Sequence, residues 1–91
     1  MENHGFSDAR FGKKLYRSGY KEEGIFYLNK GFNITTAPKI GKTLAGYLMQ
    51  NGNYKRIEEI YKLNIGTEPH RYEPRMDLLN LYLKRTVIKM S

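Results

Sequence analysis

Apolar residues return every three or four positions in five separate stretches of this chain, which is the spacing of one face of an α-helix. No stretch shows the strict alternation of apolar and polar residues that is typical of a β-strand. The pattern therefore predicts an all-α protein of five helices in one domain, residues 1–91. Its three units are a helical hairpin over 8–33, a second hairpin over 38–65 and a closing helix over 73–89.

Residues that typically begin or end helices lie between these stretches. Ser7 or Asp8 can cap the first helix, and Gly19 can end it because glycine adopts the left-handed conformation without strain. Pro38 suits the first turn of the third helix, and Gly52 interrupts the pattern before the fourth. Such short turns predict antiparallel neighbouring helices.

The inward positions predicted from this spacing are mostly large and aliphatic, with a few glycines and alanines. The closing helix differs, because its apolar residues cover more than one face. We therefore expect residues 76–88 to mediate self-association or to bind a hydrophobic partner, which makes an oligomeric structural subunit a further alternative function. The predicted apolar positions are Phe11, Leu15, Gly24, Ile25, Leu28, Gly31, Phe32, Ile40, Leu44, Ala45, Leu48, Met49, Ile57, Ile60, Tyr61, Leu63, Met76, Leu78, Leu79, Leu81, Tyr82, Leu83 and Val87.

The two hairpins can be overlaid as an internal repeat. An offset of 33 residues aligns Gly12 with Ala45, and one further residue after the turn aligns Phe26 with Ile60. A period of 33 or 34 residues is typical of stacked helical hairpins. Small residues recur in such repeats because only a small side chain fits where two helices cross closely.

The first unit resembles a tetratricopeptide repeat. Phe11-Gly12 followed by Leu15 is similar to that family's first helix, and residues 19–32 are similar to its turn and second helix, with Gly24 and Gly31 at the small-residue positions. The second unit carries Ile57 and Asn64 where small residues are expected, and residues 46–55 also resemble a pentatricopeptide repeat, an RNA-reading relative. The resemblance implies about two and a half stacked repeats. An unrelated bundle of four or five helices is the alternative.

In tetratricopeptide stacks the first helices of the repeats line a concave groove that holds an extended peptide. The resemblance therefore implies a basic, tyrosine-containing groove and a non-catalytic adaptor that binds an acidic protein segment. The groove residues that it implies are Phe6, Lys13, Tyr16, Arg17, Lys39, Lys42, Met49, Gln50, Arg75 and Tyr82.

Charge supports an anionic partner but leaves its class open. Sixteen Lys and Arg residues against nine Asp and Glu residues give a formal net charge of +7. A basic stripe along the first helix makes a small nucleic-acid-binding protein the alternative function, with eight tyrosines available for stacking on bases. The stripe is otherwise only the solvated face of that helix. Its members are Arg10, Lys13, Lys14, Arg17 and Lys21.

Residues suited to catalysis or metal binding are few. The chain has no cysteine, and His4 and His70 stand alone, so we expect neither a metal nor a cofactor. Glu22-Glu23 and Glu58-Glu59 are adjacent pairs, whose side chains point about 100° apart on a helix and do not converge. We therefore expect no enzyme activity. Because neither a signal peptide nor a membrane-spanning stretch is visible, we expect a soluble, cytoplasmic protein.

Overall fold

A computed structural model of the chain describes residues 4–90, with side chains described as far as Val87. Within this range the protein is built from helices and short turns alone. The five-helix, all-α prediction is confirmed. The helices are α1 (His4–Arg17), α2 (Lys21–Thr35), α3 (Pro38–Asn51), α4 (Tyr54–Thr67) and α5 (Tyr72–Met90).

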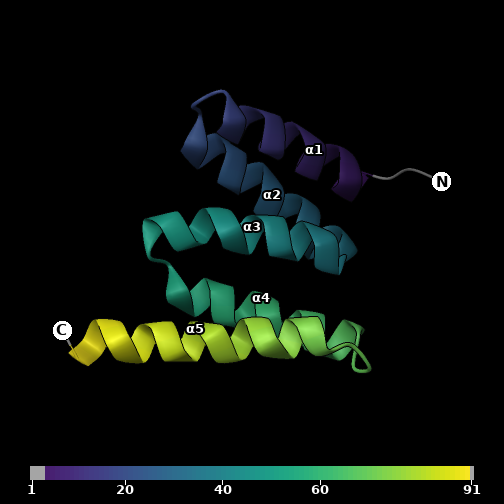
Figure 1. The fold of residues 1–91 in the computed structure, drawn as a ribbon. Helices are drawn as coiled ribbons and strands as arrows, with labels where there is room; N and C mark the ends of the chain where they lie inside the picture. The colour runs from purple at the N-terminus through teal and green to yellow at the C-terminus, as the bar shows by residue number, and fades with distance from the viewer. Residues whose placement is uncertain (1–3, 91) are drawn as a thin grey trace.

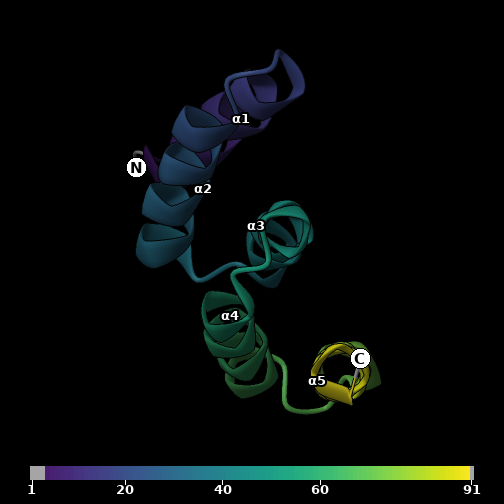
Figure 2. The same ribbon diagram turned by 90° about the vertical axis from the view of Figure 1, so that its left-hand side faces the viewer.

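The helices stack as successive antiparallel neighbours (Figure 1). Seen from the side, α1, α3 and α5 lie along one side of the stack and α2 and α4 along the other (Figure 2). Each helix packs mainly on the helices next to it in sequence, and the molecule measures 44 × 33 × 15 Å. This arrangement is the predicted stack of helical hairpins and not a closed bundle.

The predicted turn residues take the expected conformations. Gly19 and Gly52 have φ angles of +102° and +74°, in the region that glycine adopts without steric cost. Pro38 lies in the first turn of α3, where its missing N–H breaks no helical hydrogen bond. The Asn53 side chain caps α4 by accepting a hydrogen bond from the Arg56 N–H.

Several predicted helix ends need correction. α1 begins at His4, before the predicted caps Ser7 and Asp8, and α2 continues to Thr35. α4 runs to Thr67, because the Glu68 N–H still donates to the carbonyl of Asn64 at 2.9 Å. The second hairpin therefore extends past the predicted boundary at residue 65.

Glycines bring α1 and α2 into backbone contact at two points. A methyl group at Gly12 would lie 2.5 Å from the carbonyl oxygen of Gly24, and one at Gly24 would lie 2.6 Å from that of Gly12. Seven residues away on each helix, about two turns, a methyl group at Gly31 would lie 2.3 Å from the carbonyl oxygen of Gly5. The predicted role of Gly12, Gly24 and Gly31 in close helix packing is confirmed.

The buried face of α1 differs from the prediction. It consists of Gly5, Ala9, Gly12 and Tyr16. Phe11 is 50% exposed and Leu15 only half-buried, so their assignment as the inward residues of this helix was wrong. The cause is the glycine contact: the face that approaches α2 has no room for large side chains. Phe11 lies beside this face, with its ring edge-on to Tyr27 at 4.9 Å.

Most other predicted core positions are confirmed, and the described core is continuous from α1 to α5. Leu63 is an exception, because it is exposed and Asn64 takes the inward position. On α5 only Leu81 is buried among the predicted apolar residues, with Leu78 half-buried, and Ile88 lies outside the described side chains. The most deeply buried large side chains are Phe32, Leu28, Leu44, Ile57, Ile60 and Leu81.

The repeat register also needs one correction. The predicted extra residue after the turn pairs Phe26, which is 60% exposed, with the fully buried Ile60. An offset of 33 kept throughout pairs buried positions instead. Gly24 then matches Ile57 and Gly31 matches Asn64, and all four are buried.

Candidate functional site

A hollow of about 340 Å³ lies where α1, α2 and α3 meet. Apolar atoms of Ala9, Leu28 and Ile40 belong to the core and form its floor. We call it the basic hollow, because three cations stand around that floor. Its lining residues are Phe6, Ala9, Arg10, Lys13, Leu28, Lys39, Ile40 and Thr43.

Helical spacing explains why these side chains converge. Phe6, Ala9, Arg10 and Lys13 are three, four and seven residues apart, so they share one side of α1. Lys39 follows Pro38 in the first turn of α3 and reaches the same space from the opposite wall. The aromatic ring of Phe6 and three cations therefore surround a small apolar surface.

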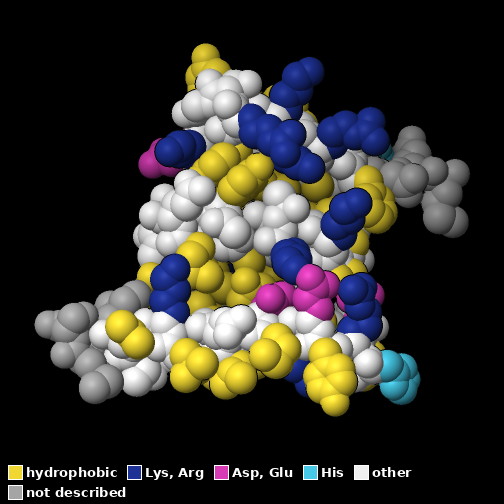
Figure 3. Space-filling model, in the orientation of Figure 1, with side chains coloured by type: hydrophobic (Ala, Val, Ile, Leu, Met, Phe, Trp, Pro, Cys, Tyr) yellow, Lys and Arg dark blue, Asp and Glu magenta, His cyan; other side chains and the backbone are white. Residues whose placement is uncertain are grey.

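The described residues do not neutralise the cations of the basic hollow. Among the residues that the structure describes, Arg10, Lys13 and Lys39 have no carboxylate within ion-pair distance. The carboxylates that do form ion pairs, from Glu58 to Asp77, belong to α4, α5 and the turn between them. Lys and Arg side chains accordingly gather over α1 and α3 on this face, and Asp and Glu beside α5 (Figure 3). The uncompensated charge favours an anionic ligand.

Lys42, predicted to line the groove, is engaged within the chain. Its ammonium group forms an ion pair with Glu73 and lies 4.0 Å from Asp77. The hydrogen bond to Glu73 raises the pKa of Lys42, and the same bond lowers the pKa of Glu73. Lys42 therefore fastens α5 to α3, and its charge is already balanced.

Tyr16 and Gln50 join the two hairpins. The Tyr16 ring is 7% exposed and stacks on the ring of Tyr47 at 3.7 Å between centroids. Its hydroxyl group donates a hydrogen bond to the Gln50 side chain. Tyr16, predicted as a groove residue, thus offers a partner very little surface. Met49 is half-buried and packs against the core.

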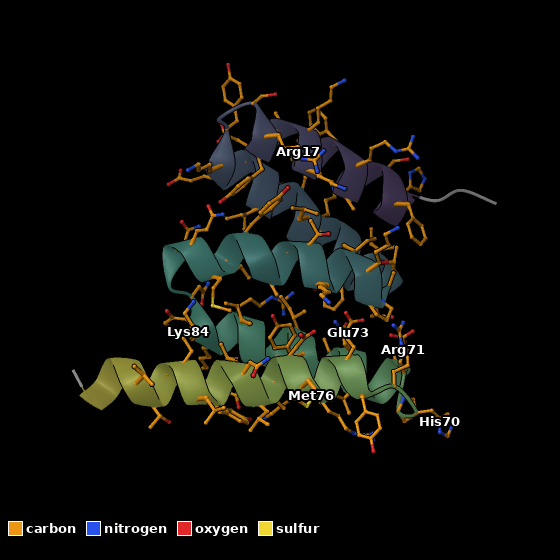
Figure 4. The ribbon with its side chains drawn as sticks, viewed as in Figure 1. Arg17, His70, Arg71, Glu73, Met76 and Lys84 are labelled. Carbon is orange, nitrogen blue, oxygen red and sulfur yellow. The ribbon has the colours of Figure 1, made fainter. Side chains whose placement is uncertain are left out.

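The remaining predicted groove residues lie away from the basic hollow. Arg17 is exposed near the end of α1 (Figure 4). Tyr82 on α5 donates a hydrogen bond to Glu58 on α4 at 2.8 Å, and this bond lowers the pKa of Glu58. Arg75 is exposed on α5 and does not line the hollow. Of the predicted groove residues, only Phe6, Lys13 and Lys39 line the basic hollow.

The basic stripe proposed for nucleic acid does not run along one helix. Arg10, Lys14 and Arg17 are exposed on α1, and Lys13 is half-buried. Lys21 begins α2 on the other side of the turn, with its ammonium group 5.8 Å from the centre of the Tyr16 ring. Placing it on the first helix was wrong, because Gly19 reverses the chain before it.

The floor of the basic hollow was not foreseen from the sequence as part of a site. Ala9 and Thr43 carry no chemical signal, and Leu28 and Ile40 were identified only as core residues. Arg10 was assigned to the competing stripe. A search for cations at i and i+3 beside a small residue, Ala9-Arg10 and Lys13, would have found this wall.

A second hollow of about 310 Å³ lies where the start of α3 meets the turn before α5. Charges of both signs pair there: Arg71 lies 3.2 Å from Glu68 and 3.1 Å from Glu73. Over the described residues, no three His, Cys, Asp or Glu side chains are grouped to hold a metal ion. No helix in that range combines the length and the apolar character needed to cross a bilayer.

Comparison with known proteins adds no relationship. No protein-family model matches the chain, and no curated protein matches it. The function must therefore be argued from the fold and from the basic hollow itself.

Proposed function

We propose that this protein is a non-catalytic interaction module of the tetratricopeptide type, which binds an acidic peptide segment in the basic hollow. The observation that carries the proposal is the set of three cations, Arg10, Lys13 and Lys39, around an apolar floor, without any described carboxylate to balance them. The carboxylates described in the second half of the chain form ion pairs with other Lys and Arg side chains.

The chemistry of the basic hollow suits a particular kind of segment. Ala9, Leu28 and Ile40 provide apolar contact for one aliphatic or aromatic side chain, and the exposed ring of Phe6 stands at the edge. The surrounding cations suit carboxylates on either side of that residue. We therefore expect the ligand to carry acidic residues flanking a single hydrophobic residue.

Two features support a tetratricopeptide-like geometry. The first helices of the hairpins, α1 and α3, lie together with α5 on one side of the stack, the side where that family binds peptides (Figure 2). The small-residue positions of the first unit, Gly12, Gly24 and Gly31, lie at its helix contacts. These features favour the adaptor proposal over an unrelated bundle.

The test is fluorescence anisotropy with a labelled peptide of Glu and Asp residues around a central Leu. Lys13→Glu with Lys39→Glu should abolish binding, whereas Lys30→Glu with Lys55→Glu should retain it. Both double variants change the net charge by the same amount, and Lys30 and Lys55 are exposed on α2 and α4. Equal loss in both variants would show attraction to net charge alone and would overturn the proposal.

A mixed single-stranded oligonucleotide tests the alternative function. Nucleic-acid binding falls steeply with added salt because phosphates release condensed counterions. If the oligonucleotide binds more tightly than the peptide, and Lys14→Glu with Arg17→Glu weakens it, the exposed stripe on α1 is the site. That outcome would replace the adaptor proposal with the nucleic-acid one.

A further inference from the structure

The outer side of α5 carries a row of exposed apolar side chains. Tyr72, Met76, Leu79 and Leu83 are 81%, 48%, 47% and 56% exposed. Their spacing of four, three and four residues places them within one narrow arc of the helix. We call these four residues the α5 stripe; hydrophobic side chains are visible along the lower edge of this helix in Figure 3. A contiguous row of this kind is typical of an interface.

The position of the α5 stripe follows from the stack. Every other described helix contributes at least four buried residues, whereas α5, over its side chains up to Val87, buries only Pro74 and Leu81. Successive helices alternate in direction, and α5 is the fifth, so the stripe faces the place that a sixth, antiparallel helix would take (Figures 1 and 2). The described residues supply no such helix.

The order of residues along α5 fits a second copy of the same helix. Let a two-fold axis pass between residues 79 and 80 of two antiparallel α5 helices. Met76 of one copy is then level with Leu83 of the other, Tyr72 is level with Val87, and the two Leu79 side chains meet near the axis. The apolar pattern is therefore self-complementary, as an isologous interface requires.

Charge beside the α5 stripe agrees with the same pairing. Glu73 and Lys84 lie near opposite ends of α5 on the same flank (Figure 4). In an antiparallel pair with a two-fold axis, equal flanks meet, so Glu73 of each copy approaches Lys84 of the other. Lys84 is exposed and has no ion pair to the described residues of its own chain, so it is available for this contact.

We propose that two copies of this chain dimerise through α5 in antiparallel orientation, each α5 packing its stripe on that of the other. The dimer adds a two-fold axis at one end of the stack and leaves the basic hollow exposed at the other. It presents two basic hollows to the same partner or to two partners, which strengthens binding through multivalency. The proposal does not depend on the adaptor function.

Sedimentation equilibrium tests the dimer. The wild-type chain should sediment as a dimer at micromolar concentrations, and Leu79→Glu with Leu83→Glu should sediment as a monomer with unchanged helical circular dichroism, because both side chains are exposed in the single chain. The matched control is Phe26→Glu with Ile34→Glu, an equally exposed apolar pair on α2, which should remain dimeric. A wild-type monomer at 200 µM, or dissociation by the control pair as well, would overturn the proposal.

Orientation is tested by disulfide formation, since the chain has no cysteine of its own. Met76→Cys protein mixed with Leu83→Cys protein should cross-link to each other faster than either cross-links to itself. Lys84→Glu should weaken the dimer about threefold, the effect of losing one exposed ion pair on each side. Preferential self-cross-linking of Met76→Cys would show parallel helices and refute the antiparallel dimer.

Discussion

The two hairpins share one topology but are held together by different contacts. In α1–α2 the helices meet backbone to backbone at Gly12 with Gly24 and at Gly5 with Gly31. In α3–α4 the positions 33 residues later hold Ala45 and Ile57, which are fully buried, and Pro38 and Asn64, which are linked by a hydrogen bond of 3.4 Å. The helices therefore cross through backbone contacts in α1–α2, whereas side chains occupy the two corresponding crossing points in α3–α4.

This difference explains where apolar side chains are exposed. Because glycines occupy the α1–α2 contact, the large residues beside it, Phe11 and Phe26, remain at least half exposed, and each has its ring edge-on to that of Tyr27. In α3–α4 the large residues fill the contact itself and join the central core. A hairpin can thus keep its shape while moving its hydrophobic side chains from the core to the surface.

The largest loss of stability should come from truncating Ile57, which occupies the helix contact of the second hairpin that Gly24 occupies in the first. Ile57→Ala leaves a cavity at a fully buried position and should lower the free energy of unfolding by about 3–4 kcal/mol. Urea denaturation followed by circular dichroism measures this loss. Stability within about 1 kcal/mol of wild type would mean that α3 and α4 can close together as α1 and α2 do.

The converse change tests the glycine contact. Gly24→Ala places a methyl group 2.6 Å from the carbonyl oxygen of Gly12, and because backbone atoms cannot move aside singly, α1 and α2 must separate. We expect a loss of about 2–3 kcal/mol in the free energy of unfolding.

Gly46→Ala is the matched control for this change. Gly46 lies within α3, where an added methyl group would meet nothing within 4 Å beyond its chain neighbours and the nearby backbone of its own helix, so alanine should stabilise the protein by about 0.5–1 kcal/mol. If both substitutions had the same sign, the close contact at Gly24 would have no energetic consequence, and the comparison of the two hairpins would fail.

The sequence predicted the helices well and the use of their faces less well. Helical spacing and the breaks at Gly19, Pro38 and Gly52 are local signals, and the structure follows them. Which side of α1 is buried depends on what α2 presents, so Phe11 was misplaced. A large apolar residue normally marks the inward face, and only the matching glycines of α2 show that this contact has no room for one.

The candidate site was only partly predictable for a related reason. The family resemblance could place Lys13 and Lys39 on neighbouring first helices, but it could not show that Glu73 neutralises Lys42 or that Tyr16 stacks on Tyr47. Both contacts join residues at least 31 positions apart. They depend on how far α5 and α3 approach their neighbours, which periodicity does not encode.

A smaller effect is expected at the polar crossing point of the second hairpin. Asn64 is buried, its amide oxygen has no hydrogen-bond partner, and its amide nitrogen makes only the long bond to Pro38. Asn64→Leu removes an unsatisfied polar atom and should change the free energy of unfolding by less than about 1 kcal/mol, measured by urea denaturation. A loss of several kcal/mol would show that the second hairpin depends on this hydrogen bond.

The smallest predicted effect is that of acid, which should weaken the packing of α5 more than that of α1 on α2. Hydrogen bonds from Tyr82 and Lys62 hold the pKa of Glu58 below its usual value of 4.5, and Lys42 does the same for Glu73. A carboxylate whose pKa is lowered by folding stabilises the folded state fully above pH 4.5 and loses that contribution as the pH falls through its lowered pKa.

The stabilisation of α5 by these pairs should therefore fade below pH 4.5, while the α1–α2 contact, made by glycine backbone, should not respond. Hydrogen exchange at pH 3.5 and pH 6, corrected for the intrinsic exchange rate at each pH, should show selective loss of protection in α5. Glu58→Gln at pH 6 should weaken α5 in the same direction, because the neutral amide keeps the shape of the side chain but removes the charge that Lys62 and Arg85 pair with. Equal loss of protection in α1 and α5 at low pH would mean that the two ends of the stack unfold together, so that the difference in their contacts does not give them separate stabilities.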